Sequence, residues 1–376
     1  MKEMQDGRLS VLLGGRNVGT LAETGDHRVA FEYSAEWLET GFSISPISLP
    51  LQKGVFVPKS FEPFEGVFGV FADSLPDGWG RLLVDRMLLR EGLNPYEVST
   101  MTRLAIVGSS GMGALVYEPD RKLGMEGEKG TLDELAKSCE EILKSRDSGN
   151  LDELFRMGGS SGGARPKVNY HMDGEEWIVK FPSSYDPTNI GLLEYEYSRC
   201  AKECGIEMTK TKLMPSKICE GFFATKRFDR EGKRRIPMIS VCAILETSHR
   251  IPNLDYHILM RLTLKLTNDF SQLEQLYRRM CFNVFAHNRD DHSKNFSFLY
   301  NMEEQRWCLS PAYDLTYSNS IGGEHATTVD GNGRDPGMKE LLAVAKSAKL
   351  DLRKSKLIAE EIQEKTIPLL KMSTGN

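Results

Sequence analysis

Short runs of alternating apolar and polar residues predict β-strands in the first third of the chain. Residues 8–33 contain three such runs, RLSVLLGG, VGTLAET and RVAFEY, and the GGRN turn supplies glycines for the positive φ angles of a hairpin. Ser34 fits the N-cap of one or two helical turns that follow it. Residues 75–92 predict a turn and then an amphipathic helix, whereas 104–117 predict a strand, a glycine turn and a second strand.

The rest of the chain shows a change from strand patterns to helix patterns. A second hairpin, VNYHM and EEWIVKF around a DG turn, precedes a helix at 191–206, and helical periodicity dominates from about residue 250. Four parts follow from this order: a β-rich module at 1–118, a helical connector at 119–150, a part with a glycine-rich loop at 151–229, and a mainly helical part at 230–376. The pattern predicts an α+β protein with a β-rich lobe, a helical lobe and a ligand cleft between them.

Composition places few further limits on function. The chain has 376 residues, enough for two or three lobes, and its net charge of −5 argues against a nucleic-acid footprint over the whole surface. It contains no apolar run of membrane-spanning length and no apolar leader at its N-terminus. None of the seven cysteines forms a CxxC pair. We therefore expect a cytoplasmic protein with reduced thiols, no membrane partner and no metal–thiolate site.

One polar cluster stands out between an apolar helix pattern and the strand FSFLY. Its members lie in the stretch FAHNRDDHSKN and are His287, Asp290, Asp291, His292, Lys294 and Asn295. A transition-metal site is disfavoured because no HExxH or paired-histidine pattern occurs. Two interpretations remain open, a solvated loop without a role and a catalytic loop. In the second, Asp290 orients a hydroxyl nucleophile and Asn295, five residues later, binds Mg²⁺, which is the D-x-x-x-x-N spacing of kinases.

Asp314, in the stretch LSPAYDLTYS, favours the catalytic interpretation. One turn and one strand separate it from Asn295, and a hairpin of that length would bring the two side chains together. A carboxylate and an amide oxygen are hard ligands that suit Mg²⁺ bound to ATP phosphates. An aspartate after a strand can also serve only as a helix N-cap or turn residue.

Lys180 interrupts the apolar strand run EEWIVKF, and lysines inside buried strands are rare unless they are paired. A kinase needs such a lysine to hold the α- and β-phosphates, and the next helix offers Glu194 and Glu196 as partners. The alternative is an edge-strand lysine that prevents sheet-to-sheet association.

The stretch GGSSGGARPK at 158–167 precedes the Lys180 hairpin. Its composition is typical of a flexible linker. Its position before the hairpin instead favours a loop whose backbone N–H groups hold phosphates. It is not a Walker A motif, because Val168 follows Lys167 where Ser or Thr would be required.

Taken together, these segments resemble the HipA family, bacterial serine/threonine kinases that form the toxin half of type II toxin–antitoxin pairs. The resemblance rests on SSGGARPK, IVKFP, KRFDR, NRDDHSKNFSFL and LSPAYDL, with support from LPDGWGRLLVDR and EHATTVDGNGRDP. It covers nearly the whole chain. It implies a two-lobed fold similar to that of phosphoinositide kinases, with ATP and Mg²⁺ as cofactors, and it assigns the parts 1–118 and 151–229 to a HipA-like N-terminal module and to the ATP-binding portion.

The resemblance also implies a role for individual residues. Asp290 matches the catalytic base, Asn295 and Asp314 match the Mg²⁺ ligands, and Lys180 and Glu194 match the ATP lysine and a helix glutamate. Ser160 or its neighbour Ser161 matches an autophosphorylated serine of the glycine loop. The family also implies that a hinge at Lys226–Phe228 binds ATP, with Lys226 and Phe228 among the contacting residues. The other ATP-binding residues that it implies are Ser161, Gly162, Gly163, Ala164, Lys167, His292 and Lys294.

The functional expectation is a HipA-like kinase that phosphorylates a protein, such as an aminoacyl-tRNA synthetase, and its own glycine loop. Its expected partners are the protein substrate and a small helix-turn-helix antitoxin (HipB-like), with DNA contacted only through the antitoxin. Three departures from the family pattern are IPMISVCAILETSH in place of an HQxDxCQ-like segment, Lys226 where an acidic residue is common, and a compact C-terminal region after Asp314. Two alternatives remain: a small-molecule phosphotransferase, and a non-enzymatic co-repressor that acts with a DNA-binding antitoxin.

Overall fold

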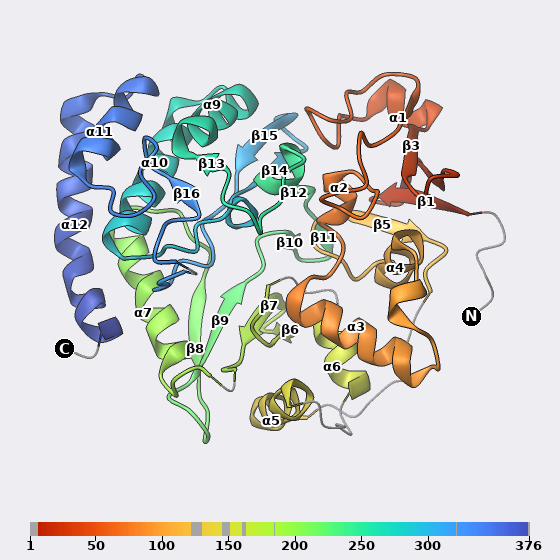
Figure 1. The fold of residues 1–376 in the computed structure, drawn as a ribbon, viewed down its shortest axis with the longest axis horizontal. Helices are drawn as coiled ribbons and strands as arrows, with labels where there is room; N and C mark the ends of the chain where they lie inside the picture. The colour runs from red at the N-terminus through yellow and green to blue at the C-terminus, as the bar shows by residue number, and fades with distance from the viewer. Residues whose placement is uncertain are drawn as a thin grey trace. The chain divides into compact units, whose positions relative to one another are not determined.

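The computed structural model describes residues 7–121, 130–144, 151–159, 163–183, 185–320 and 322–374. The chain divides into two compact units. Unit 1 comprises Met1–Thr188, Met214–Ile239 and Ala243–Thr247, and unit 2 comprises Asn189–Leu213, Ser240–Cys242 and Ser248–Asn376. Three short elements, β8 (Thr211–Met214), β12 (Met238–Ser240) and α8 (Val241–Ile244), contain points where the chain passes from one unit to the other. Figure 1 labels β8 and β12.

The first sheet of unit 1 is built from the strands that the alternating pattern predicted. Its order is β4-β3-β2-β1-β5. Its antiparallel hairpin turns at Gly14 and Gly15, whose φ angles of 58° and 80° favour glycine. Leu9, Val11 and Leu13 alternate into the core, as expected for a strand with one buried face. The strands are β1 (Arg8–Leu13), β2 (Arg16–Glu23), β3 (Val29–Tyr33), β4 (Val55–Phe56) and β5 (Leu115–Glu118).

Helices accompany this sheet, and one of them corrects the sequence analysis. Ser34 caps α1 as predicted, because its hydroxyl accepts the Trp37 N–H. The predicted strand at the start of 104–117 is wrong: these residues belong to α4, which begins after Ser99, whose hydroxyl accepts the Thr102 N–H. The helices are α1 (Ala35–Thr40), α2 (Gly69–Ala72), α3 (Gly78–Arg90), η1 (Pro95–Glu97) and α4 (Thr100–Val107).

A second sheet carries the predicted hairpin with Lys180. The strands β6 (Lys167–Met172) and β7 (Glu175–Lys180) pair antiparallel, and β7 pairs with β9 (Phe222–Lys226). The helices α5 (Leu132–Leu143) and α6 (Leu151–Gly158) share a core with this sheet. Large side chains at the centre of that core include Trp79, Leu135, Trp177 and Phe222. A short ribbon of β10 (Arg230–Glu231) and β11 (Arg234–Arg235) follows β9.

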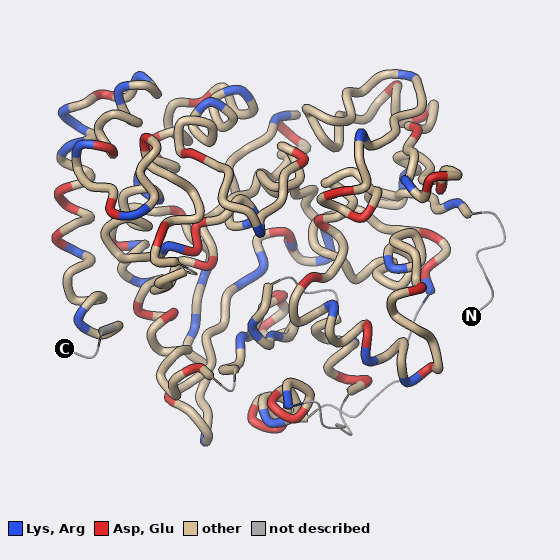
Figure 2. The backbone as a smooth tube through the Cα atoms, viewed as in Figure 1, with Lys and Arg blue, Asp and Glu red and all other residues tan. Residues whose placement is uncertain are grey.

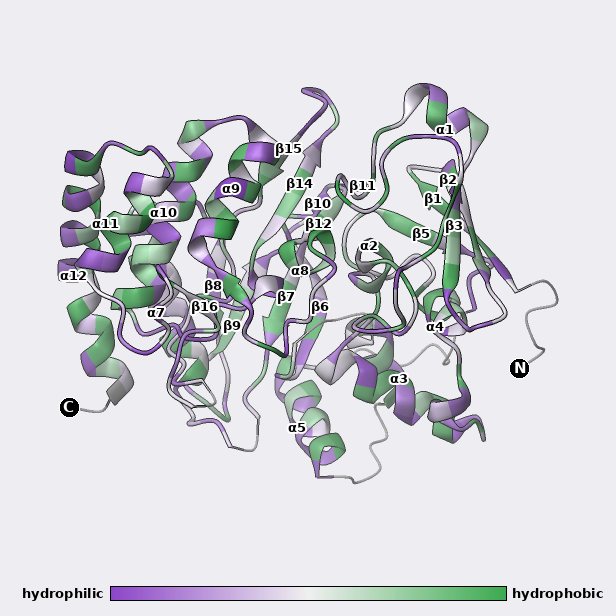
Figure 3. Cartoon of the chain, turned by 45° about the horizontal axis from the view of Figure 1, so that its top comes forward, coloured by the Kyte–Doolittle hydropathy of each residue, from purple (hydrophilic) through white to green (hydrophobic). Residues whose placement is uncertain are grey.

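Unit 2 is mainly helical, as the sequence predicted for most of this region. Figure 3 shows alternating hydrophobic and hydrophilic patches along its helices, as expected for helices with one buried face. The helices are α7 (Ile190–Glu203), α9 (Tyr256–Thr267), α10 (Phe270–Phe285), η2 (Ser293–Asn295), α11 (Met338–Ser347) and α12 (Leu352–Thr374). The strands are β13 (Leu254–Asp255), β14 (Ser297–Asn301), β15 (Arg306–Leu309) and β16 (Thr327–Thr328). Among the described residues, no helix combines the length and apolar character needed to cross a membrane.

Candidate functional site

The Asp290 loop, defined here as residues 286–296, connects α10 to β14 in unit 2. The side chain of Asp290 is 61% exposed, and its Oδ1 lies 3.8 Å from His292 Nε2. Asn295 Nδ2 donates a hydrogen bond of 2.7 Å to the Asp290 carbonyl oxygen. That bond ties the two predicted residues together across the loop, while the Asp290 carboxylate faces solvent, where a substrate hydroxyl can reach it.

The hairpin of β14 and β15 returns the chain to this loop. Its register pairs Phe298 with Leu309, and the Ser310 N–H donates to the Ser297 carbonyl at 2.9 Å. Beyond the hairpin, the Tyr313 hydroxyl donates to the Lys294 carbonyl at 2.7 Å. Residues on both sides of the turn therefore hold the segment that contains Asp314 against the segment that contains Asn295.

Asp314 is further placed by Asn288, whose Nδ2 lies 3.4 Å from the Asp314 carbonyl oxygen. The backbone of Asp314 is left-handed, with φ of 53°. Because Asn295 uses its amide nitrogen on Asp290, its oxygen is the atom that can face a cation. One carboxylate and one amide oxygen suit Mg²⁺, which takes few protein ligands and completes its shell with phosphate and water. Across the described part of the chain, no group of three His, Cys, Asp or Glu residues could hold a metal ion.

Lys180 lies in unit 1, at the end of β7, and its ammonium sits 5.6 Å from the centre of the Phe223 ring. This cation–π contact, together with partial burial of the side chain, keeps the lysine against the sheet. Lys167 lies opposite it on β6 and is buried. Glu194, the expected helix glutamate, belongs to α7 of unit 2 and is also buried.

The predicted glycine loop is described only at its C-terminal end. Ser160, Ser161 and Gly162 lie outside the described residues. Gly163 has a left-handed φ of 82°, its N–H donates to the Asp77 carboxylate, and its carbonyl accepts the Trp79 N–H at 2.9 Å. The start of α3 therefore anchors the exposed segment of Gly163 and Ala164 that leads into β6.

The predicted hinge at Lys226–Phe228 begins at the last residue of β9 in unit 1. The Lys226 ammonium lies 2.5 Å from the Glu175 carboxylate, in a pair that is about one-third exposed. Lys226 therefore has an acidic partner on the neighbouring strand. Phe228 is half-buried and precedes Asp229, a fully buried carboxylate.

Asp229 contacts two of the basic residues that Figure 2 shows along the segment from β9 to β11. Its Oδ2 lies 2.7 Å from both Arg227 Nη2 and Arg230 Nη1 and accepts the Gly113 N–H at 2.8 Å. Burial alone would raise the pKa of Asp229, but the two guanidinium groups and the hydrogen bonds outweigh it and hold the pKa below its usual value. Sequence analysis gave Asp229 no role, because its partners are recognised only after folding.

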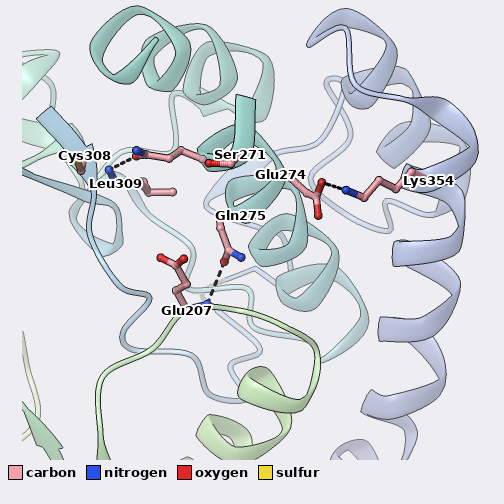
Figure 4. A pocket seen from close by; sticks show the side chains of 8 residues that line it. Glu207, Ser271, Glu274, Gln275, Cys308, Leu309 and Lys354 are labelled. Carbon is pink, nitrogen blue, oxygen red and sulfur yellow. Dashed lines mark hydrogen bonds and ion pairs between the residues drawn. The ribbon is translucent and has the colours of Figure 1, made fainter. Parts of the chain in front are cut away.

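A separate hollow in unit 2 contains none of the predicted site residues. Its volume is about 420 Å³, and Glu207, Gln275 and Leu309 are among its lining residues (Figure 4). Most of its polar groups are already engaged: Gln275 Oε1 accepts the Glu207 N–H, and Lys354 lies 2.5 Å from Glu274. These contacts join α10 to the loop that contains Glu207 and to α12.

The predicted residues therefore form two groups, one in each unit. Unit 2 brings together Asp290, His292, Lys294, Asn295 and the segment of Asp314. Unit 1 carries Gly163, Ala164, Lys167, Lys180, Lys226 and Phe228. The buried residue Asp291 was noted in the sequence only as a member of the polar cluster, without a role.

Two protein-family models match this chain, one in its N-terminal region and one in its C-terminal region. Residues 159–368 match the model described as the HipA-like C-terminal domain, and residues 9–118 match the model described as the HipA N-terminal domain. These two matches leave residues 1–8, 119–158 and 369–376 uncovered.

Two curated relatives cover most of the chain. A protein of Sinorhizobium fredii named "Putative kinase Y4dM" is 26% identical over 327 residues, which is 82% of this chain and 76% of the relative. A protein of Shewanella oneidensis named "Serine/threonine-protein kinase toxin HipA" is 22% identical over 346 residues, which is 82% of this chain and 74% of the relative. Both names describe a kinase.

A solved structure supports the fold. The Shewanella oneidensis MR-1 complex of HipA, HipB and operator DNA contains a chain that matches 97% of this chain and 91% of its own length, with a TM-score of 0.70 and 19% identity. The mixed sheets and helices of the two units agree with this match, which confirms the predicted α+β, two-lobed kinase-like fold.

Proposed function

The chain belongs to the HipA family, and from this premise we propose that it is an ATP-dependent protein serine/threonine kinase. The observation that best supports the proposal is the arrangement in unit 2. There, side-chain to backbone hydrogen bonds of 2.7 to 3.4 Å hold the segments that carry the exposed Asp290 carboxylate, the Asn295 amide and Asp314. A base and two hard-oxygen ligands at this spacing are the groups that phosphoryl transfer requires.

In the proposed reaction, Asp290 orients a serine or threonine hydroxyl and accepts its proton. The hydroxyl oxygen forms a bond to the γ-phosphorus of ATP, the bond from that phosphorus to the bridging oxygen breaks, and ADP leaves. Asn295 and Asp314 would hold Mg²⁺, which would neutralise charge at the phosphates. Lys180 holds the α- and β-phosphates. Most of the rate enhancement then comes from positioning and electrostatics.

The glycine loop has a second proposed role, which rests on the family resemblance. Ser160 or Ser161 accepts the γ-phosphoryl group, and the resulting phosphoserine places about −1.5 to −2 charges where ATP phosphates must bind. The modification acts as an off-switch. Intact-mass measurement after incubation with Mg²⁺ and ATP is expected to show added phosphate, which the double substitution Ser160→Ala with Ser161→Ala removes from the loop. An intact mass with the same added phosphate in that double variant as in the wild type would contradict the assignment.

For partners, we propose a protein substrate and a small helix-turn-helix antitoxin. The matched solved structure is a complex of a HipA with HipB and operator DNA. The net charge of −5 favours DNA contact through the antitoxin over direct binding by this chain.

The activity is tested with labelled ATP and Asp290→Asn. We expect label in protein, with the rate in the variant reduced about 100-fold or more, because general-base catalysis contributes about that much. Glu303→Gln is the matched control: it also removes one carboxylate from unit 2, in the exposed turn between β14 and β15, and it should keep the wild-type rate.

Other outcomes identify the alternatives. Label that enters small metabolites and no protein would favour a small-molecule phosphotransferase. Capture of a small helix-turn-helix protein without any ATP turnover would favour a non-enzymatic co-repressor. Equal rates for the wild type and Asp290→Asn would refute the assignment of the base.

A further inference from the structure

Two consecutive aspartates in the Asp290 loop have opposite environments. The Asp290 side chain is 61% exposed, whereas the Asp291 side chain is completely buried, at 0%. Burying a carboxylate costs several kcal/mol unless hydrogen bonds or charges compensate for the lost water. The partners of Asp291 therefore determine what this residue does.

Three donors from distant parts of unit 2 surround the Asp291 carboxylate. Its Oδ1 accepts the Thr327 N–H at 3.1 Å. Its Oδ2 accepts the Tyr256 hydroxyl at 3.0 Å and lies 3.1 Å from His325 Nδ1. Burial, followed by the nearby Asp291 charge, raises the pKa of Tyr256 well above its usual value. The phenol therefore stays protonated and donates a hydrogen bond to Asp291.

The backbone of Asp291 is held as well as its side chain. Its carbonyl oxygen accepts the Thr327 hydroxyl at 2.5 Å. Two residues earlier, the Arg289 carbonyl accepts the Ala326 N–H at 3.0 Å. The strand that contains Thr327, β16, pairs in turn with β13, directly before Tyr256. The backbone at Arg289 and at Asp291 is therefore held by β16 and by the residue directly before it.

The same hydrogen-bonded chain continues to the predicted metal-binding segment. The Tyr256 hydroxyl accepts Asn283 Nδ2 at 2.9 Å, and Asn283 Oδ1 accepts Asn288 Nδ2 at 2.9 Å. Asn288 Nδ2 also reaches the Asp314 carbonyl at 3.4 Å. The Tyr256 ring packs edge-to-face on Phe296, the neighbour of Asn295, with ring centres 5.9 Å apart.

We propose that Asp291 is the positioning residue of the site, and that it holds Asp290, Asn295 and Asp314 in register through the network of Tyr256, His325, Thr327, Asn283 and Asn288. The inference rests on the proposed kinase function. Asp290 directly precedes Asp291 in the chain. Asn295 directly precedes Phe296, which packs on Tyr256, and the Asp314 carbonyl oxygen lies 3.4 Å from Asn288 Nδ2. A displacement of about 1 Å in a reacting group can reduce a rate about 100-fold, so rigid support of this kind determines the turnover rate.

The network predicts a particular kinetic effect for Asp291→Asn. The amide offers one acceptor and one donor where Thr327, Tyr256 and His325 need acceptors, so one contact is lost. We expect kcat to fall about 10- to 100-fold and the KM for ATP to change by a smaller factor. The network orients the base and the Mg²⁺ ligands, whereas Lys180, which is proposed to hold the phosphates, lies outside it.

A milder variant keeps the test valid if Asp291→Asn folds poorly. Tyr256→Phe removes a single hydroxyl and should lower kcat about 3- to 10-fold with the same small change in KM. Tyr277→Phe is the matched control: Tyr277 is equally buried in unit 2, but its hydroxyl donates to the Ser355 carbonyl, at 3.2 Å, outside the network. It should leave kcat within about twofold of the wild type.

Two measurements separate positioning from general stability. The double variant Asp291→Asn with Tyr256→Phe should be about as slow as Asp291→Asn alone, because both changes break one connected network. Amide exchange in the Asp290 loop should be about tenfold faster in Tyr256→Phe and unchanged in Tyr277→Phe.

Failure of this inference is distinguishable from failure of the proposed function. An active wild type with folded Asp291→Asn and Tyr256→Phe variants that match Tyr277→Phe in kcat would overturn the positioning role. Additive kinetic losses in the double variant would also overturn it. A wild-type protein that transfers no phosphate would instead refute the kinase assignment.

Discussion

Two buried aspartates, one in each unit, are stabilised in different ways. Asp229 in unit 1 is neutralised by two guanidinium groups at 2.7 Å. Asp291 in unit 2 receives hydrogen bonds from a phenol and a backbone N–H and lies beside a histidine. The first arrangement depends on charge and the second on hydrogen-bond direction. Charge attraction tolerates small displacements, whereas directed hydrogen bonds fix orientation, which suits a residue adjacent to a catalytic base.

The surroundings of Asp229 show what its charge supports. Arg230 donates to the carbonyls of Gly113 and Gly111, at 2.8 and 2.9 Å, and Arg235 donates to the same two carbonyls, at 3.0 and 2.8 Å. Burial lowers the pKa of Arg230 to about 9, and the Asp229 charge acts in the opposite direction. Asp229 therefore makes it possible to bury the arginines that hold the glycine-rich turn before β5.

The largest expected effect follows from removing that charge. Asp229→Asn leaves Arg227 and Arg230 buried without a counter-charge and should lower the free energy of unfolding by about 3–5 kcal/mol. Urea unfolding measures the loss. The control Glu231→Gln changes a side chain that is 72% exposed and should alter the free energy by less than about 0.5 kcal/mol. A loss below about 1 kcal/mol for Asp229→Asn would remove the distinction between the two aspartates.

Acid should reproduce part of this loss without any substitution. Because the pKa of Asp229 is lowered in the folded protein, its contribution to stability is complete above the unfolded value of 3.8 and is lost as pH falls through the folded value. The stability difference between the wild type and Asp229→Asn should therefore shrink below about pH 4. Unfolding curves at a series of pH values provide the measurement, and a difference that grows on acidification would have the wrong sign.

Asp291→Asn should have a smaller effect on stability than Asp229→Asn. Its partners are a phenol, a histidine and a backbone N–H, so one unsatisfied group is left and no unpaired guanidinium, at a cost of about 1–3 kcal/mol. Urea unfolding of the two variants under identical conditions compares them directly. Equal losses for both would show that the hydrogen bonds at Asp291 contribute as much stability as the charge pairing at Asp229.

The smallest effect is expected at the predicted hinge. Lys226→Met breaks the pair with Glu175, but both side chains are about 30% exposed, so solvent screening limits the loss to about 1 kcal/mol or less. The KM for ATP should stay within about twofold, because the hinge is expected to contact adenine through its backbone. A tenfold rise in KM would instead assign the Lys226 side chain to ATP binding.

The parts of the fold that follow from local signals were predictable. Ser34, the glycine turn at 14–15 and the hairpin that contains Lys180 each have a pattern that few other structures satisfy. The error at α4 has a clear cause: a short apolar run suits a buried strand as well as a buried helix. The N-cap at Ser99 was the signal that distinguishes them.

The spacing of the site residues in the sequence indicated which segments would meet. It did not indicate which side chains would be buried and which exposed. The interval from Asp290 to Asn295 and the hairpin before Asp314 indicated which segments meet, and residues of those segments do contact each other. Nothing in the letters DD distinguishes the exposed Asp290 from the buried Asp291. That difference arises from Tyr256, His325 and Thr327, which are remote in sequence and become neighbours only in the folded unit.

The left-handed backbone at Asp314 limits which amino acids position 314 can accept. With φ at 53°, glycine, asparagine and aspartate are the residues that the backbone tolerates readily, and other side chains cost about 1–2 kcal/mol. The substitution Asp314→Ala would therefore remove the carboxylate and also strain the turn. Asparagine preserves the turn and removes only the charge, so it is the substitution that isolates the chemical role of Asp314.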